Sequence, residues 1–538
     1  MTRRDFLRIS GSAAVATAAG CVDGAAAVAA AMVPPTAIDV FVYGSTPSGI
    51  AAALEAARRG CRVVLACPKS HVGGMLASGL GGLDAKRGDL QSGFVLEFRQ
   101  AMRDLYQRRA DAGAPEWQLK APRRGGNEPS AVEAMFSQML AVQAERLAVW
   151  SGHHLLTATT HAGRIIEVEC EAPNGSRRQL TAQTFIDATY EGDLAAAARV
   201  PCRIGRESRD EFGESLAGII YVDAKDGREL VTSDSGAASP AIQAYCARCV
   251  FTTDPERMVP FEKPATYEQH QMDLWPWLAD FESGRIQNRT YGKALPGQKW
   301  ELNGSIDQQT SLNCPGISWA WPEADRRRRA TLAQFHVDHA ASFFWFLQNE
   351  PRLPERVRAQ WKLAGRHRDE FPDNGHWPFQ IYVRQGRRIE GRARVTQHNF
   401  TVDRKLGRTP RVEHPIAIGD YSVDVHPCHD RRHAIRGLME GAIWYRTVVP
   451  SPTQPGQIPY SAMLPRTLDN LLVPVCLSSS HIGMAVVRME PVWMITGQVA
   501  GLAAAEAKDT RRDVAQIDPA SLPARARLIT DPGPAKAI

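Results

Sequence analysis

The body of the chain lacks any long apolar run. After residue 40, no stretch of 18 or more uninterrupted apolar residues occurs, whereas a membrane-spanning helix needs about 20. The chain also lacks a large excess of one charge, since its 538 residues include 64 Lys and Arg and 58 Asp and Glu. Nucleic-acid-binding domains concentrate basic residues on one face. We therefore expect no transmembrane span in the body and no nucleic-acid partner.

Cysteine patterns typical of a metal site are missing too. The sequence has ten cysteines, and only Cys246 and Cys249 form a C-x-x-C pair. A zinc ribbon or a four-cysteine cluster needs a second pair, so we predict no metal site. The pair is expected on one helix face or in a disulfide of an oxidising compartment. The one dense basic run, 326–329, predicts a solvated helix face.

The first 35 residues predict an export signal and a linker. A paired arginine at positions 3–4, followed by a spaced Phe-Leu and an Ala-rich stretch over 9–19, resembles a twin-arginine signal. Two processing sites stay open: a lipoprotein-like box that would leave Cys21 acylated, or cleavage in the small-residue run 25–31. Because the twin-arginine route carries folded proteins, we expect a chain that is exported folded. It would then lie in the periplasm or be anchored on the outer face of the membrane.

Residues 38–67 predict a strand, a tight turn, a helix and a second strand. Apolar runs at 38–43 and 62–67 flank the Ala-rich segment 50–59, which Gly60 closes. Such a βαβ unit binds a dinucleotide at the helix N-terminus, where free N–H groups and the helix dipole attract a pyrophosphate. The turn therefore supplies cofactor-binding candidates: Gly44, Ser45, Thr46, Pro47, Ser48 and Gly49.

Two positions depart from the dinucleotide-binding pattern G-x-G-x-x-G. Thr46 stands where the middle glycine is usual, and Cys67 stands where the second strand usually ends in an acid. An acid at that place accepts hydrogen bonds from the adenosine ribose. Cys67 keeps the position beside the cofactor but leaves the ribose contact open.

Two later segments extend the candidate cofactor site. The segment 71–75 follows the second strand, and its glycines let a bulky cofactor approach the backbone. Two β-rich stretches between 164 and 181, joined by a Pro-Asn-Gly turn, predict a β-meander that leads into a strand at 184–188. The further cofactor-binding candidates are His71, Gly73, Gly74, Met75, Ala188 and Thr189.

Together these segments make the sequence similar to a known family. It resembles the FAD-dependent oxidoreductases with FAD binding of the glutathione-reductase type, many of them secreted and some labelled xanthan-lyase-like. The resemblance implies FAD as the cofactor. It also implies an α/β fold in which a two-dinucleotide-binding, Rossmann-like FAD domain holds an inserted α+β substrate domain. The matching segments are 44–49, 71–75, 185–195, 205–208, 373–378, 382–384 with 387–388, 416–427 and 470–507.

The resemblance sets the expected domain boundaries. The FAD domain should combine residues 36–210 with 460–510, and the substrate domain should cover 211–459. Residues 1–35 form the signal and linker, and 511–538 form a C-terminal tail. Strands near 39–43, 62–67, 184–188 and 471–475 should share one sheet.

The C-terminal segment should complete the flavin site. An apolar strand at 470–475 and a polar loop precede Arg488, Met489 and Glu490, which open a helix that runs to about residue 507. A helix N-terminus with an arginine beside it can stabilise the negative charge of a reduced flavin. We therefore predict that all three residues bind the cofactor and that Arg488 also acts in catalysis.

The expected reaction is oxidation of a small polar substrate, with hydride passing from a substrate carbon to flavin N5. His426 is the preferred base and His481 the second candidate. A carbohydrate is one candidate substrate because the middle of the chain is rich in Trp. Arg384, Arg387 and Arg388 could each hold an anionic substrate group or form a structural salt bridge.

Two other activities stay open. One is the reverse direction, in which a flavin enzyme reduces an activated double bond or carbonyl. The other is a carbohydrate-active, lyase-like enzyme in which FAD is structural. The expected partners are a small-molecule substrate and an electron acceptor that the sequence does not identify.

Overall fold

The computed structural model describes residues 38–119, 126–223, 228–274, 292–304, 311–428, 438–443 and 453–534. Residues 36–538 form one unit by their contacts, and residues 1–35 form another. The predicted export signal and Cys21 therefore lie outside the described residues, as do Trp275 and Trp277 of the substrate region.

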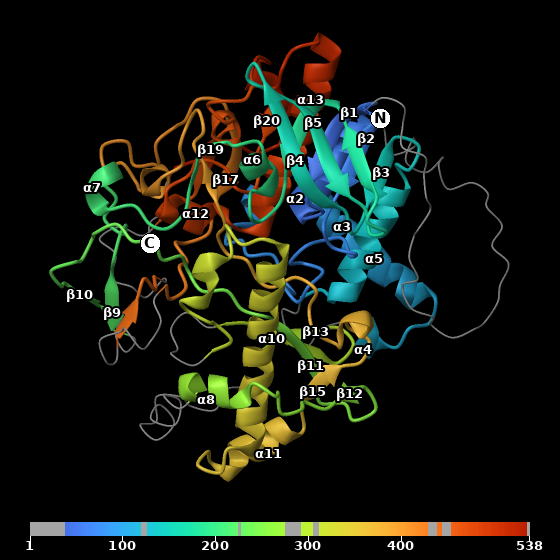
Figure 1. Ribbon diagram of the computed structural model, residues 1–538, viewed down its shortest axis with the longest axis vertical. Coiled ribbons are helices and arrows are strands. Elements are labelled where there is room, and N and C mark those ends of the chain that lie inside the picture. Colours follow the sequence, from blue (N-terminus) through green and yellow to red (C-terminus); the bar gives the residue numbers. More distant parts are fainter. Residues whose placement is uncertain are drawn as a thin grey trace. The chain divides into compact units, whose positions relative to one another are not determined.

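A parallel sheet of five strands lies in the upper part of the larger unit as drawn in Figure 1. Its order is β20-β7-β1-β2-β3, and every neighbouring pair is parallel. Apolar residues predominate in these strands, and most of them are buried, as expected of a parallel sheet covered on both faces. The strands are β1 (Ile38–Tyr43), β2 (Val63–Ala66), β3 (Leu147–Trp150), β7 (Ala182–Asp187) and β20 (Leu471–Leu472).

This sheet confirms the predicted α/β fold and the shared sheet of its four expected strands. The last strand is shorter than the predicted 470–475, since only Leu471–Leu472 pairs with β7. The sequence prediction missed β3, which lies at the sheet edge beside β2. It also missed α12 (His481–Val487), where a polar loop was expected.

The two β-rich stretches predicted between 164 and 181 are confirmed as strands of an antiparallel meander, and its first strand was not predicted. The meander consists of β4 (His154–His161), β5 (Arg164–Glu171) and β6 (Arg177–Leu180). Asn470, which directly precedes β20, connects this strand to the meander. Its side chain accepts from the N–H of Ile165 and donates to the carbonyl of Ile165, both at 2.9 Å.

Two helices from opposite ends of the chain pack closely beside the sheet. These are α2 (Pro47–Arg58) and α13 (Glu490–Thr510), seen in blue and red in Figure 1. A Cβ on Gly497 would lie 2.1 Å from the carbonyl oxygen of Ser48, and one on Gly501 would lie 2.2 Å from that of Ala52. The two glycines therefore let the helices touch backbone to backbone. Two further helices, α3 (Gly93–Asp111) and α5 (Pro129–Ala141), complete this layer.

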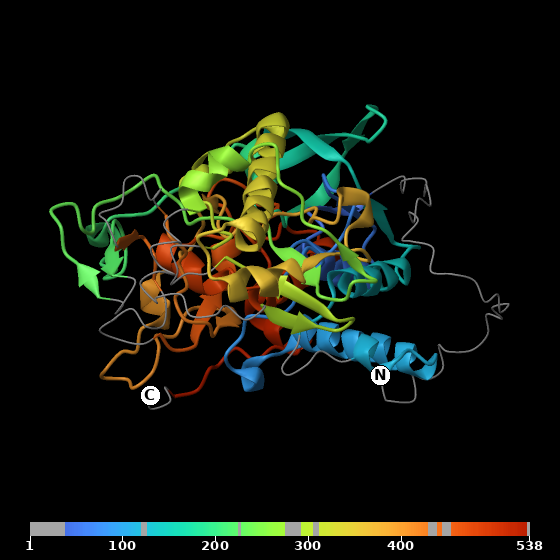
Figure 2. The same ribbon diagram turned by 90° about the horizontal axis from the view of Figure 1, so that it is seen from below.

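The middle of the chain builds a second, antiparallel sheet with the order β12-β15-β11-β14-β13. The long helix α10 (Arg326–Asn349), yellow in Figures 1 and 2, brings Phe344 against Phe251 and Trp361, with ring centroids 5.8 and 5.7 Å apart. Trp361 is thus a core residue. The strands are β11 (Cys249–Thr252), β12 (Met258–Val259), β13 (Lys293–Leu295), β14 (Lys299–Leu302) and β15 (Gly365–His367).

Shorter elements connect these layers. The helices are α4 (Glu116–Leu119), α6 (Asp193–Ala197), α7 (Arg209–Phe212), α8 (Tyr267–Leu274), α11 (Glu355–Lys362) and α14 (Leu522–Arg525). The strands are β8 (Cys202–Arg203), β9 (Tyr221–Asp223), β10 (Glu229–Leu230), β16 (Arg388–Ile389), β17 (Pro415–Gly419), β18 (Leu438–Glu440) and β19 (Gly456–Pro459).

Two local predictions need correction. The basic run begins α10 behind the N-cap Asp325, but Arg329 is half-buried and pairs with Asp193 at 2.6 Å, so only the first three arginines form a solvated face. Cys249 begins β11, and the backbone of Cys246 forms an isolated antiparallel β-bridge with Tyr382. Both are free cysteines. The pair therefore lies neither on a helix nor in a disulfide.

In the described part of the chain, no group of three or more His, Cys, Asp or Glu side chains is placed to hold a metal ion. The helices described are too short or too polar to cross a membrane.

The backbone contact of α13 with α2 can be tested with Gly501→Ala. In an exposed helix this change stabilises by about 1 kcal/mol. Here the new methyl would lie 2.2 Å from the carbonyl oxygen of Ala52, so we expect a loss of about 1–3 kcal/mol instead. Thermal unfolding measures the effect. Gly88→Ala is the control because its Cβ would meet nothing within 4 Å, and equal midpoints for the two variants would contradict the contact.

Candidate functional site

The turn between β1 and α2 leaves no room for side chains at its two glycines. Gly44 has a φ of +106°, and a Cβ there would lie 2.7 Å from the backbone of Ala188 and Thr189 at the end of β7. A Cβ on Gly49 would lie 1.8 Å from the carbonyl oxygen of Gly44. The structure therefore brings together the two segments that the sequence singled out.

Thr46 explains one departure from the glycine pattern. It is the N-cap of α2 in an extended conformation, so the position needs no glycine. Its hydroxyl accepts from the N–H of Gly49 at 3.2 Å and donates to the carbonyl of Ala188 at 2.8 Å. Pro47 has no N–H, and the N–H of Gly49 is bonded to Thr46. Of these first-turn residues, Ser48 can therefore offer its N–H to an anion at the positive end of the helix dipole.

Cys67 does not take the place of the missing acid. Its thiol donates to the carbonyl of Lys69 at 3.2 Å, and burial raises the pKa of the thiol above its ordinary value. The group is therefore neutral. It lies beside Ser45 in the candidate site but lacks the charge that an acid would bring to a ribose.

The segment 71–75 folds back onto this turn, with the N–H of Gly73 donating to the carbonyl of Ser45 at 2.8 Å. His71 lies between two carboxylates, 2.9 Å from Glu133 and 2.8 Å from Asp373, and its ring stacks on Phe379 at 4.3 Å. The hydrogen bond to Glu133 raises the pKa of His71, although burial opposes it. Both ring nitrogens are thus engaged, and His71 links the nucleotide-binding part to the middle of the chain.

Tyr190 joins three segments of the site, and sequence reasoning missed it. Its hydroxyl accepts from the N–H of Met75 at 3.0 Å and donates to Glu490 at 2.6 Å. A Cβ on Gly74 would lie 2.4 Å from the same hydroxyl, which explains that glycine. Its position directly after the strand that ends at Asp187 was the available signal.

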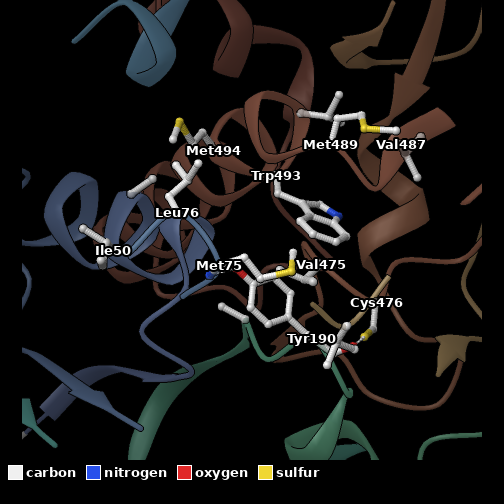
Figure 3. Packing of buried hydrophobic residues seen from close by; sticks show 14 of the residues in the cluster. Ile50, Met75, Leu76, Tyr190, Val475, Cys476, Val487, Met489, Trp493 and Met494 are labelled. Carbon is white, nitrogen blue, oxygen red and sulfur yellow. Dashed lines mark hydrogen bonds between the residues drawn. The ribbon is translucent and has the colours of Figure 1, made fainter. Parts of the chain in front are cut away.

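The start of α13 carries hydrogen-bond donors that have no acceptor among the described residues. Burial raises the pKa of Glu490 from its ordinary 4.5 to about 8, so its carboxyl is protonated at neutral pH. Its Oε2, the indole Nε1 of Trp493 and Nε of Arg488 are buried and without partners in the described residues. Figure 3 shows the indole next to Met75 and Tyr190, with the two aromatic rings 5.5 Å apart. Such donors suit a ring with several acceptor atoms.

Arg488 is buried but paired. Its guanidinium donates to the carbonyl of Asp424 at 2.8 Å and lies 3.4 Å from the carboxylate of the same residue. Burial raises the pKa of Asp424, and the charge of Arg488 opposes that shift. The cation predicted beside the flavin therefore already has one counter-charge.

The two candidate bases differ in their hydrogen bonds. His426 Nδ1 accepts from the amide of Asn313 at 3.0 Å, which places its proton on Nε2, 3.7 Å from Asp424. His481 Nδ1 lies 2.9 Å from Oε1 of Gln385, an acceptor, so its proton is on Nδ1. Within the described part of the chain, this bond at Nδ1 is the one hydrogen bond that the His481 ring makes, so Nε2 carries the lone pair.

Both imidazoles are held neutral. Burial, followed by the charges of Arg384, Arg488 and Arg248, lowers the pKa of His426 well below 6.5. Burial, followed by Arg206, Arg388 and Arg488, does the same to the pKa of His481. The side chain of Gln243 connects the two histidines, since it accepts from the N–H of His426 and donates to Gln385, both at 3.4 Å.

A sequence profile described as FAD dependent oxidoreductase matches residues 39–526. The chain belongs to this family. No curated protein matches it. FAD is therefore its cofactor, and the chain is an FAD-dependent oxidoreductase.

Several solved structures are similar to this oxidoreductase at low identity. A geranylgeranyl bacteriochlorophyll reductase-like protein from Thermoplasma acidophilum is 12% identical, with a TM-score of 0.32, over 91% of this chain and 82% of the other. A triple mutant of a flavin-dependent brominase is 10% identical, with a TM-score of 0.37, over 91% and 84%. The myxobacterial chondrochloren halogenase, a variant of FAD-dependent halogenases, is 16% identical with a TM-score of 0.23, and the match spans 40% of this chain and 44% of the halogenase.

The residues of the site fit FAD. The turn at Gly44 and Gly49, which a Cβ would fill, and the N-terminus of α2 would hold the pyrophosphate. The unpartnered donors of Glu490 and Trp493 would meet the acceptor atoms of the flavin ring. The hydroxyl of Tyr190 holds the Glu490 carboxyl in place.

The raised pKa of Glu490 predicts a pH dependence of stability. Between about pH 4.5 and 8 the folded state holds one proton more than the unfolded state. The free energy of unfolding should therefore fall as pH rises through this window, by at most about 1.4 kcal/mol per pH unit.

Glu490→Gln, which is neutral throughout, should make that fall less steep. Urea unfolding of flavin-free protein at several pH values measures it. Glu145→Gln, at an exposed position, is the matched control and should leave the slope unchanged. An unchanged slope in Glu490→Gln would show that the carboxyl is ionised in the folded state.

Proposed function

We propose that this oxidoreductase oxidises a small polar molecule, with hydride leaving a substrate carbon and a buried histidine taking the hydroxyl or amine proton. Bound FAD supplies the hydride acceptor at N5. Polar side chains around the candidate bases support a polar substrate: Gln243, Gln385, Asn303 and Asn313. Tryptophan supports a carbohydrate less, because Trp361 is in the aromatic core and the indoles of Trp319 and Trp321 are hydrogen-bonded within the protein.

The hydrogen bonds of the two histidines favour His481 as the base. A general base needs a nitrogen with a free lone pair within reach of the proton that it removes. His426 uses its lone pair to accept from Asn313, whereas the lone pair of His481 lies on the unpartnered Nε2. This observation carries the proposal and reverses the order that the sequence suggested.

The surroundings of His481 support the same role. Its backbone N–H donates to Glu207 at 2.8 Å, and Gln385 fixes the ring from the Nδ1 side. Burial keeps the imidazole neutral, so the base is in its active form at neutral pH without first losing a proton. Arg488 forms an ion pair with Asp424 near the start of α13. It would stabilise negative charge that develops near it during the reaction.

His481→Gln should slow substrate-driven flavin reduction by about 10²- to 10⁴-fold, the usual contribution of a general base. The amide keeps a donor near Gln385 but is not basic, so flavin content should stay the same. Anaerobic stopped-flow bleaching with a substrate found by screening measures the rate. His398→Gln is the control, because that histidine is exposed and its ring bonds to the backbone carbonyl of Phe212.

Each other outcome of that experiment has a clear meaning. Equal rates for His481→Gln and wild type would remove His481 as the base. A flavin that no substrate bleaches, but that is reoxidised by an activated double bond or carbonyl, would indicate a reductase. Release of an unsaturated sugar without consumption of an electron acceptor would indicate a lyase.

We also propose that residues 1–35 direct export by the twin-arginine route to the periplasm or to the outer face of the membrane. The double substitution Arg3→Lys and Arg4→Lys should retain the protein in the cytoplasm, because the route requires the paired arginines. Cell fractionation by immunoblot measures this. Cys21→Ser separates the two processing sites, since it removes membrane association only if Cys21 is acylated. Export of the double variant at wild-type level would reject the proposal.

A further inference from the structure

One buried arginine differs from all the others that the structure describes. Five arginines in the described residues are buried, namely Arg206, Arg248, Arg384, Arg388 and Arg488. Four of them have a carboxylate partner, at 2.5 Å in Glu440, 3.0 Å in Glu301, 2.8 Å in Glu207 and 3.4 Å in Asp424. Arg384, which is 1% exposed, makes no ion pair with any described residue.

The groups that contact Arg384 directly are uncharged. Its guanidinium donates to the carbonyl of Ala244 and to Oδ1 of Asn303 at 3.2 Å, and it lies 4.7 Å from the ring centroid of Tyr382. A weaker contact reaches the sulfur of Cys246 at 3.5 Å. Burial lowers the pKa of Arg384, and the charges of Arg488 and Arg248 lower it further.

No carboxylate of the described residues forms an ion pair with Arg384, although the charge of Arg384 does act on Asp424. Glu301 pairs with Arg248, and Asp424 pairs with Arg488. Asp84 acts on Arg248 and on Asp424, but it makes no ion pair with Arg384 in the part of the chain that the structure describes. A buried cation without a counter-ion is strongly unfavourable, so a protein that keeps one normally supplies the anion from elsewhere.

The neighbouring arginines of the same segment provide the contrast. Arg387 lies 3.2 Å from Asp193, and Arg388 lies 2.8 Å from Glu207, so both form structural ion pairs. The sequence left all three arginines open to either role. The structure assigns the structural role to two of them and leaves Arg384 available.

Arg384 also lies beside the proposed reaction centre. Among the charged groups that act on His426, it has the strongest effect. The next residue along the chain, Gln385, hydrogen-bonds His481, the proposed base. A group held by Arg384 would therefore belong to a molecule that reaches the base.

The geometry points to Arg384 as the binding residue for a carboxylate of the substrate, so that the oxidised molecule is a small organic acid; this rests on the proposed function. One unpaired guanidinium matches one negative charge, and its planar donors match the two oxygens of a carboxylate. A dianionic phosphate would bring a second charge, and the two neighbouring arginines that the structure describes, Arg248 and Arg488, are already paired.

The test compares acids with their uncharged counterparts on the FAD-loaded enzyme. Acetate, lactate and glucuronate are titrated against acetamide, lactamide and glucose, with inorganic phosphate as a further probe. The flavin difference spectrum and the thermal midpoint report binding. We expect at least one acid to bind at least tenfold more tightly than its neutral counterpart, and Arg384→Met to abolish that preference with an unchanged flavin content.

Arg387→Met is the matched control, because it removes a neighbouring cation that Asp193 already pairs. It should keep the preference for the acid. Arg384→Lys keeps the charge but loses the planar fork, and it should retain part of the preference, which keeps the test valid if Arg384→Met fails to fold.

Three results would overturn the inference while leaving the proposed function intact. These are flavin-loaded enzyme that shows no preference for any of the acids, an equal loss in the Arg384 and Arg387 variants, and binding of phosphate in preference to all three carboxylates. Failure of the proposed function would show differently, as purified protein without flavin or as flavin that no substrate reduces.

Discussion

The direct contact between α2 and α13 is the constraint on which the rest of the site depends. Gly497 and Gly501 let the C-terminal helix touch the backbone of the helix that follows the dinucleotide turn. This contact places the N-terminus of α13, with Glu490 and Trp493, next to the segment that carries Met75. Bulkier residues at the two glycines would separate the pyrophosphate-binding end of the site from its flavin-binding end.

Burial then determines the charge state of nearly every group in the site. It keeps Glu490 protonated and both His426 and His481 neutral. Each neutral group can offer either a donor or a lone pair in a site with little water. Such preorganised groups interact more strongly with a ligand than they would in solution, because the effective dielectric constant is low.

Sequence patterns predicted the parts of the fold that depend on local order. The strands 38–43, 62–67 and 184–188, the meander and the C-terminal helix all follow from apolar periodicity and glycine placement. Thr46 looked like a defect in the glycine pattern, yet a threonine at a helix start is also an N-cap signal, and the structure uses it so. The short strand β3 was missed because four apolar residues give too little periodicity to distinguish a strand from a helix end.

The chemistry of the site was less predictable, because it depends on contacts between distant segments. The hydrogen bond from Tyr190 to Glu490 joins residues 300 positions apart, and no sequence pattern in either segment predicts it. The order of the two histidines depends on Asn313 and Gln385, which lie far from them in sequence. Arg384 could not be told from Arg387 and Arg388 until their carboxylate partners were known.

The placement of α13 also bears on when the protein can acquire its cofactor. The strand β20 and helix α13 come from the last 70 residues of the chain, yet they pair with β7 and α2 from its first 190. The sheet and its helix layer can therefore be completed only after residues 471–510 have left the ribosome. Long-range pairing of this kind raises contact order and slows folding. During synthesis, the nucleotide-binding half would expose the face that α13 later covers, and a chaperone or the cofactor itself could shield that face in the meantime.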